Sequence, residues 1–299
     1  MKRLLWIAAL PLAVAAAPPP ITAVSHIAVY SADRAKSEAF YVHDLGGIKR
    51  DDPENKNGVR YYFNATQFVE VLPLPADAGK NRLDHVAFAT PDVGALRRYL
   101  AANGVAGSRV TRGADGSRWF AVNDPEGNRV EFVQAPSVPE AVPANPMSGH
   151  IIHVGFIVHD RAKEDAFYLK LLGFRPYWFG GAQGRATAWI SSQVPGGTDW
   201  LEYMVQEGPP DRGIPDAMNQ ATAGVLNHFS FGVADIRETV TRLTREGRIT
   251  GKNDGPKIGR DGKWQFNLYD PDGTRAEIME FHAVTPPCCS PFTASDPEK

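Results

Sequence analysis

The sequence has few cysteines and almost no excess charge, and these shortages exclude several classes of protein. Its 299 residues include 2 Cys, the adjacent Cys288 and Cys289, so no cysteine pattern for a zinc site is present. The formal net charge is -2 and no long basic run occurs, which argues against a nucleic-acid partner. Any metal ion in this protein must therefore be held by histidine and carboxylate side chains.

Long apolar runs are also missing, except at the N-terminus. Lys2-Arg3 precede a short apolar stretch that ends in small residues, which is the pattern of a secretory signal peptide over residues 1–17. Ala13-Val14-Ala15 fits the usual cleavage pattern, and the apolar run is shorter than the ~20 residues of a membrane span. An uncleaved N-terminal anchor is the alternative. We expect a periplasmic or secreted protein that has no membrane contact after cleavage.

Export implies an oxidising compartment, which bears on the cysteine pair. Cys288 and Cys289 lie in a proline-rich tail, where a vicinal disulfide, an intermolecular bridge and a passive tail are all compatible with the sequence.

A long internal repeat determines the expected architecture. The segment from His153 to Tyr168 matches the segment from His26 to Tyr41, and both contain Asp-Arg-Ala-Lys followed by Ala-Phe-Tyr. Each copy starts as a strand with period-2 alternation and continues into a helix that a glycine ends. Further strand patterns follow, and the same plan begins again at His85 and at His228.

These patterns predict an α+β fold of two tandem modules, each made of paired βαβββ units. The expected boundaries are 21–135 for module 1, 136–148 for a proline-rich linker, 149–284 for module 2 and 285–299 for a loose tail. The length of the chain agrees with two domains of ~150 residues.

Aligning the two modules reveals polar residues that recur at equivalent strand positions. The first strand of each βαβββ unit carries a histidine and the last carries a glutamate. The predicted metal ligands are His26, Glu70, His85 and Glu131 in module 1, and His153, Glu202, His228 and Glu277 in module 2.

Strand alternation predicts that these side chains share one face, while their apolar neighbours face the helices. Two positions after each histidine, on that same face, lies a small residue: Ala28, Ala87, Gly155 or Ser230. Such a face leaves room for an ion and a substrate. Imidazole with carboxylate suits Zn, Ni, Co, Mn or Fe, so we expect a divalent metal cofactor of unassigned identity.

With these features, the chain resembles the vicinal oxygen chelate superfamily of glyoxalases, bleomycin-resistance proteins and extradiol dioxygenases. The resemblance rests on the βαβββ repeat, on the His-Glu-His-Glu positions and on the Asp-Pro-x-Gly endings before Glu131 and Glu277. It implies that paired units form half-open, cup-shaped mixed sheets around one divalent ion, with helices on the outer face.

Two pairings of the units agree with the sequence. Either each module closes its own cup, or the modules exchange halves. The second pairing would give the sites His26/Glu70/His228/Glu277 and His85/Glu131/His153/Glu202.

The resemblance suggests three functions. Glyoxalase-like lyase or isomerase chemistry uses all four ligands, with Glu202 or Glu277 as the base that moves a proton on a small α-hydroxycarbonyl or vicinal-oxygen substrate. Extradiol ring cleavage with Fe(II) would use His153, His228 and Glu277. However, the family's catalytic Tyr position is Asn267 here, and Glu202 lies near the position of its second catalytic His. A bleomycin-resistance-like ligand-binding protein is the third reading.

We favour the first function, with a small-molecule substrate and a monomeric or homodimeric protein. The segment from Glu202 to His228 is longer than its module 1 counterpart, so it is either a cover for one cup or a surface insertion.

Overall fold

The structure is a computed structural model that describes residues 17–77, 82–137, 141–181, 188–206 and 227–298. The predicted signal peptide, apart from residue 17, lies outside the described residues. So does the possible cover, residues 207–226. Among the described residues, no helix has the length and apolarity that crossing a membrane requires.

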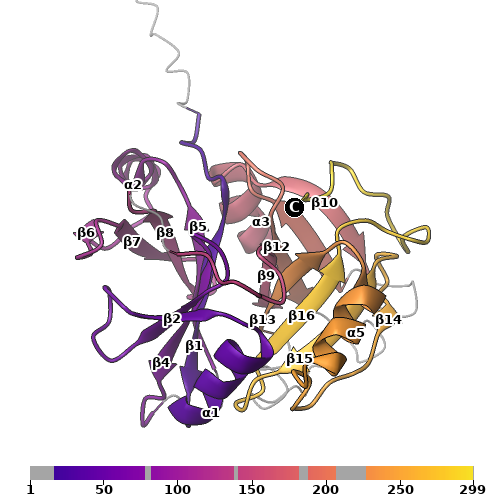
Figure 1. Ribbon diagram of the computed structural model, residues 1–299. Coiled ribbons are helices and arrows are strands. Elements are labelled where there is room, and N and C mark those ends of the chain that lie inside the picture. Colours follow the sequence, from indigo (N-terminus) through magenta and orange to yellow (C-terminus); the bar gives the residue numbers. More distant parts are fainter. Residues whose placement is uncertain (1–16, 78–81, 138–140, 182–187, 207–226, 299) are drawn as a thin grey trace, which may run out of the picture.

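Module 1 is one mixed sheet of eight strands in the order β2-β3-β4-β1-β5-β8-β7-β6 (Figure 1). Its first unit contains β1 (Ala23–Ser31), α1 (Arg34–Glu38), η1 (Ala39–Asp44), β2 (Ile48–Asp51), β3 (Val59–Tyr62) and β4 (Phe68–Pro73). Its second unit contains β5 (Leu83–Ala89), α2 (Val93–Ala102), β6 (Thr111–Arg112), β7 (Arg118–Asn123) and β8 (Arg129–Gln134).

Module 2 repeats this sheet in the order β10-β11-β12-β9-β13-β16-β15-β14. Its first unit contains β9 (Ile151–Val158), α3 (Arg161–Asp165), η2 (Ala166–Leu171), β10 (Arg175–Gly180), β11 (Trp189–Gln193) and β12 (Trp200–Val205). Its second unit contains β13 (His228–Val233), α5 (Ile236–Arg245), β14 (Lys257–Ile258), β15 (Trp264–Tyr269) and β16 (Arg275–Glu280). The predicted α+β fold of two half-open modules is confirmed.

Aspartates start the helices and glycines end them. Side chains of Asp33, Asp92, Asp160 and Asp235 accept hydrogen bonds from backbone N–H groups in the first turn of each helix. Gly46, Gly104, Gly173 and Gly247 follow the helices with positive φ angles of 77°, 81°, 79° and 68°. Where the sequence pattern predicted one helix after the first strand of each module, the structure has α1 followed by the π-helical turn η1 in module 1 and α3 followed by the π-helical turn η2 in module 2.

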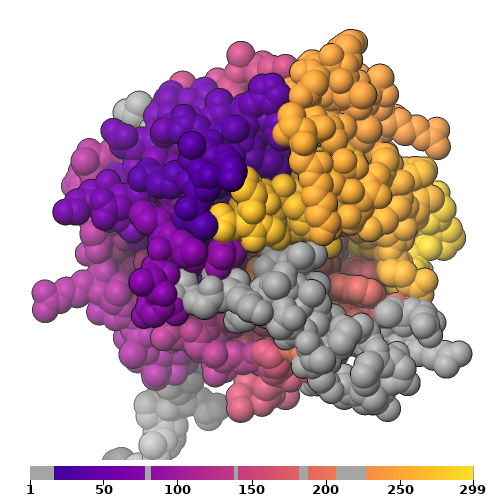
Figure 2. Space-filling model, turned by 90° about the horizontal axis from the view of Figure 1, so that it is seen from below, coloured from indigo at the N-terminus to yellow at the C-terminus, as the bar shows by residue number. Residues whose placement is uncertain are grey.

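The apolar faces of both sheets and the helices share a continuous core. Phe63 of module 1 packs edge-on against Phe231 of module 2 at 4.7 Å, and Phe88 packs against Phe174 at 5.2 Å. The modules consequently meet along a closed seam, where indigo and orange surfaces touch in Figure 2. The polar faces of the sheets point away from this core.

Equivalent hydrogen bonds cross the seam in both directions. The hydroxyl of Tyr41 in η1 donates to Asp270 of module 2 at 2.9 Å, and the hydroxyl of Tyr168 in η2 donates to Asp124 of module 1 at 3.3 Å. Burial raises the pKa of Asp270 to about 6, which reflects how little water reaches this carboxyl group. The two modules thus hold one another through the turns that precede β8 and β16.

A second pair of equivalent contacts joins the central strands. The backbone N–H of Val24 in β1 donates to Asp199 at 2.9 Å, and that of Ile151 in β9 donates to Gln67 at 2.9 Å. Because β1 and β9 also carry the first histidine of each module, the seam positions both histidines.

The C-terminal segment differs from the loose tail that we expected from residue 285. It packs over β10, near which the C-terminus lies in Figure 1. Ser290 exchanges hydrogen bonds with the backbone of Phe179, and Asp296 forms an ion pair at 2.8 Å with the fully buried Lys263. Cys288 and Cys289 form a vicinal disulfide. Among the tail contacts, the ion pair with Asp296 gives the buried charge of Lys263 a carboxylate partner.

The seam contacts generate a stability prediction. Tyr41→Phe and Tyr168→Phe should each lower the free energy of unfolding by about 1–3 kcal/mol, because each removes one of the hydrogen bonds to a buried carboxyl group. Tyr61→Phe is the control, since Tyr61 is also buried but its hydroxyl has no hydrogen bond among the described contacts. Urea unfolding measures all three, and equal loss in the control would refute this role of the hydroxyls.

Candidate metal centres

The strand ladders bring four ligand candidates together around one small residue pair in each module. In module 1, Ala28 of β1 pairs with His85 of β5 on one side and with Glu70 of β4 on the other. Ala87 of β5 similarly pairs with His26 and with Glu131. Ligands therefore flank the two alanines at the centre of the sheet, and all of them project from the same face.

Module 2 has the same register with different small residues. Gly155 of β9 pairs with His228 and Glu202, and Ser230 of β13 pairs with His153 and with Glu277. A methyl group on Gly155 would lie 2.3 Å from Cε1 of His228. Glycine is thus required for the imidazole position that this structure has.

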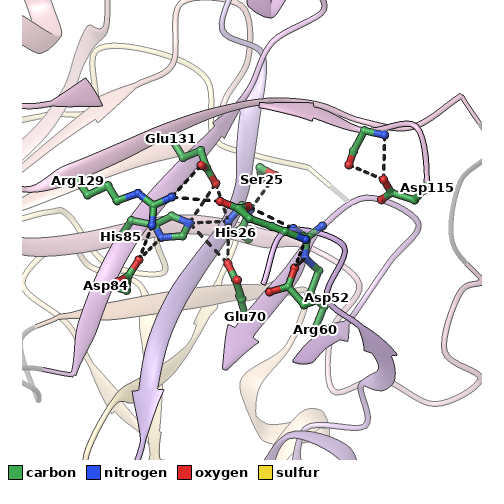
Figure 3. A network of polar contacts seen from close by, with 12 residues as sticks. Ser25, His26, Asp52, Arg60, Glu70, Asp84, His85, Asp115, Arg129 and Glu131 are labelled. Atoms are coloured by element: carbon green, nitrogen blue, oxygen red, sulfur yellow. Dashed lines mark hydrogen bonds and ion pairs between the residues drawn. The ribbon is translucent and has the colours of Figure 1, made fainter. Parts of the chain in front are cut away.

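Four side chains converge in module 1 (Figure 3). The Nε2 atoms of His26 and His85 are 2.9 Å apart. Oε2 of Glu131 lies 3.7 Å and 3.2 Å from these two nitrogens, and Oε2 of Glu70 lies 3.7 Å from each. All four residues are at most 1% exposed.

Module 2 has a matching convergence. The Nε2 atoms of His153 and His228 are 3.0 Å apart, and Oε2 of Glu277 lies 3.2 Å and 3.7 Å from them. Oε2 of Glu202 lies 3.4 Å from Nε2 of His228. The structure therefore has the arrangement in which each module closes its own cup, and the exchanged pairing does not occur. Each module contains a His/His/Glu group able to hold a metal ion.

The polar atoms of module 1 fit a divalent cation. Oε2 of Glu70 and of Glu131 are buried without a hydrogen-bond partner, although both point at the histidine pair. The far nitrogen of His85, Nδ1, lies 2.6 Å from the carboxylate of Asp84, and Nδ1 of His26 lies 3.2 Å from Ser25 Oγ. Such contacts orient imidazoles whose Nε2 atoms bind metal.

The pKa values in module 1 show that its buried carboxylates stabilise a positive charge at the centre. Burial opposes protonation of His85, but Glu131 and Asp84 outweigh it and raise its pKa to about 10. Burial also opposes ionisation of Glu131, which His85 overcomes, so that its pKa is lowered. A divalent ion between these carboxylates would stabilise their ionised forms in the same way.

In module 2 the carboxylates are held ionised. Burial favours the neutral acid, but Arg275 and then His153 outweigh it and lower the pKa of Glu277 to about 2. Burial and then Arg275 lower the pKa of His228, which favours its neutral, metal-binding form. Anionic carboxylates with neutral imidazole are the protonation states that a metal site needs.

An aromatic ring supports the first histidine of each module. Phe68 stacks on His26 with ring centroids 4.3 Å apart, and Trp200 stacks on His153 at 4.6 Å. Both aromatics open the strand that carries the first glutamate, so the repeat reproduces this support as well as the ligands.

The two centres differ in how they meet solvent. Module 2 opens into a cavity of about 270 Å³, whose wall includes Glu202, Glu277, Asn267, Arg275, Asp261, Gln265, Trp178 and Trp189. In module 1, ion pairs surround the ligands: Arg129 lies within 3.2 Å of Glu131, and Arg60 contacts Asp52 at 3.0 Å (Figure 3). Module 2 is thus a centre with room for a substrate among the described residues.

Sequence reasoning missed several of these cavity residues. Asp261 is buried, and burial raises its pKa to about 7. Trp178 donates a hydrogen bond from Nε1 to the backbone oxygen of Cys288, which links the cavity wall to the tail. Arg275 could have been found, because Arg129 occupies the same place in the repeat. Asp261 could also have been found, because Asp115 occupies the same place in the repeat, whereas Trp178 lies in a segment whose spacing differs between the modules.

The close packing at Gly155 generates a prediction about metal binding. Gly155→Ala should weaken metal binding in module 2 by roughly 10–100-fold, because the new methyl displaces His228 from its supported position. Ala28→Gly, the reciprocal change in module 1, should leave metal binding in module 2 unchanged. Elemental analysis with competition by a chelator measures both. Unchanged retention in Gly155→Ala would contradict the prediction.

Sequence comparison identifies the family. The glyoxalase/bleomycin resistance protein/dioxygenase superfamily matches residues 23–132 and 150–278. No curated protein matches the chain in sequence.

Solved structures with the same fold include enzymes of two chemistries. The 2,3-dioxygenase LapB from Pseudomonas sp. KL28 aligns with a TM-score of 0.66 and 14% identity, over 88% of this chain and 93% of that one. Homoprotocatechuate 2,3-dioxygenase from Brevibacterium fuscum aligns with a TM-score of 0.62 and 21% identity, over 90% and 83%. The Mn(II)-bound glyoxalase from Novosphingobium aromaticivorans aligns with a TM-score of 0.64 and 17% identity, over 87% and 82%.

At these identities the solved structures establish the fold, while the sequence match extends through both modules. With its two tandem cups and their repeated ligands, the chain belongs to the glyoxalase/bleomycin resistance protein/dioxygenase superfamily.

Proposed function

We propose that module 2 is the active centre of a divalent-metal-dependent enzyme with glyoxalase-like lyase or isomerase chemistry. The observation that carries this proposal is the cavity of about 270 Å³, which exposes Glu202 and Glu277 to a small molecule. The substrate class is a small α-hydroxycarbonyl or related compound with two neighbouring oxygens. A bound divalent ion would act there as a Lewis acid toward those oxygens.

The residues of the cavity have separable roles in this proposal. Glu277 lies within 3.7 Å of both histidine nitrogens, so it serves as a ligand. Glu202 lies near His228 alone, and Ser191 donates a hydrogen bond to its other oxygen at 3.3 Å. Glu202 therefore has an oxygen directed to the centre and a donor that orients it, as a base that moves a proton between adjacent carbons requires.

Ring cleavage by an extradiol dioxygenase with Fe(II) is the second candidate. Its support is the group His153, His228 and Glu277, because two histidines and one carboxylate with open positions suit non-haem iron. Against it stands Asn267, whose side chain donates to Asp254 at 3.0 Å. An amide does not take up or release protons near neutral pH, whereas ring opening requires such transfers.

One experiment separates the candidates. We expect the purified protein, analysed for metals, to convert a member of an α-hydroxycarbonyl panel under anaerobic conditions. Oxygen uptake with a catechol and bound iron would instead establish the second candidate. Tight binding of an unchanged ligand by metal-free protein would indicate a sequestering protein like the bleomycin-resistance members.

The role of Glu202 generates a kinetic prediction. Glu202→Gln should reduce kcat by roughly 10²- to 10⁴-fold, the usual contribution of a general base, while the three remaining ligands retain the ion. Glu238→Gln, which removes an exposed carboxylate on α5, is the matched control. Steady-state kinetics with metal analysis of each variant measures the effect. A drop in kcat that only follows loss of metal would contradict a role as base.

Export is also part of the proposal. It is supported by the charged and apolar start of residues 1–17 and by the disulfide between Cys288 and Cys289, a bond typical of oxidising compartments. N-terminal sequencing of the protein from its native host should find a chain that begins after Ala15 or Ala17. An intact start at Met1 would refute cleavage.

A further inference from the structure

An arginine accompanies each metal centre, two residues before the second glutamate. Arg129 on β8 and Arg275 on β16 hold this place, and alternation puts each on the same face as its glutamate. Arg129 forms ion pairs with three carboxylates of the protein. Its guanidinium contacts Asp84 at 2.9 Å, Glu54 at 3.1 Å and Glu131 at 3.2 Å (Figure 3).

Arg275 has no such partners among the described residues. It takes part in no ion pair there, and its Nε atom is buried without a hydrogen-bond partner. The sequence explains the difference. Asp84 is replaced by Asn227 in module 2, and residues 181–188, which connect β10 to β11 as Glu54 and its neighbours connect β2 to β3, contain no Asp or Glu.

Two other cations near the cavity have carboxylate partners, since Lys257 pairs with Asp254 at 3.1 Å and buried Lys263 pairs with Asp296. The guanidinium of Arg260 instead contacts a neutral disulfide sulfur, Sγ of Cys288, at 2.7 Å. Arg275 is therefore a cavity cation whose guanidinium forms no direct ion pair or hydrogen bond with the described part of the protein. A partly buried guanidinium of this kind favours a bound anion.

We propose that Arg275 binds an anionic group of the substrate, so that the substrate is a small organic anion. This inference rests on the proposed function, because it places the anion in the same cavity as the two neighbouring oxygens. Arg275 and Glu277 are two residues apart on one strand, which separates their Cα atoms by about 7 Å. The charged group is thus a carboxylate or phosphate set apart from the chelating oxygens.

The remaining wall fits the body of such a molecule. Trp178 and Trp189 offer apolar surface, and the side-chain amides of Asn267 and Gln265 lie in the same wall. A flat or short hydrocarbon body would lie against the indoles, with the oxygens toward Glu202 and Glu277 and the anion at Arg275.

A matched pair of ligands tests the charge directly. 3,4-Dihydroxyphenylacetate has neighbouring oxygens and a distant carboxylate, and 3,4-dihydroxyphenylacetamide has the same shape without the charge. Calorimetric titration of the metal-loaded full chain should give at least roughly tenfold tighter binding of the acid, the usual range for a hydrogen bond to a charged group. Arg275→Gln should remove that preference and leave binding of the amide within about twofold.

Two further variants separate a local contact from general electrostatics. Arg275→Lys keeps the charge but loses the fork of donors, so it should restore part of the preference for the acid. Arg97→Gln removes one positive charge from α2 in module 1 and should leave the preference intact. Loss of the preference in Arg97→Gln to the same degree as in Arg275→Gln would overturn a specific contact.

The outcomes also distinguish this inference from the proposed function. Equal binding of acid and amide by wild-type protein that retains metal overturns the anion site and leaves the metal enzyme in place. Preference for the acid that depends on Arg275, in protein that binds none of the divalent ions supplied, supports the anion site and refutes the metal enzyme. Failure of both ligands to bind at millimolar concentration overturns the anion site.

Discussion

The candidate centres depend on the small residues along the two paired central strands of each sheet. Ala28 and Ala87 in module 1, with Gly155 and Ser230 in module 2, each have a histidine on one neighbouring strand and a glutamate on the other. Larger side chains there would fill the space in which imidazoles and carboxylates meet, as the close approach of Gly155 to His228 shows. Backbone register then determines the rest, because a one-residue slip would turn every ligand to the opposite face.

The two modules share this arrangement of ligands but differ in the residues that surround it. In module 1, arginines and further carboxylates surround the ligands, and the charge of Arg129 is balanced by the carboxylates of Asp84 and Glu131 (Figure 3). In module 2, Asn227 replaces the aspartate and the centre opens into a cavity. The duplication thus supplies two similar sets of ligands, while the residues around each set determine whether a substrate can approach. The seam joins them, since β1 and β9 each contact the other module.

Much of this was predictable from the sequence, since the repeat and the period-2 alternation carry the information. The two modules, the strand faces and the gathering of His153, His228 and Glu277 follow from local patterns that tertiary packing reinforced. The pairing of units did not follow, because exchanged and closed cups bury the same faces. Nor did the packing of the tail, which depends on contacts between residues far apart in the sequence, such as Asp296 with the buried Lys263 and Ser290 with Phe179.

The central claim is that the face of module 2 holds a divalent ion between its two histidines. Anomalous X-ray diffraction from crystals of the metal-loaded protein, recorded on both sides of the absorption edge of the metal, tests it most directly. The account predicts a peak about 2.0–2.3 Å from Nε2 of His153 and of His228 and within bonding distance of Glu277. A fully loaded protein whose ion lies elsewhere, with both imidazoles unligated, would contradict it.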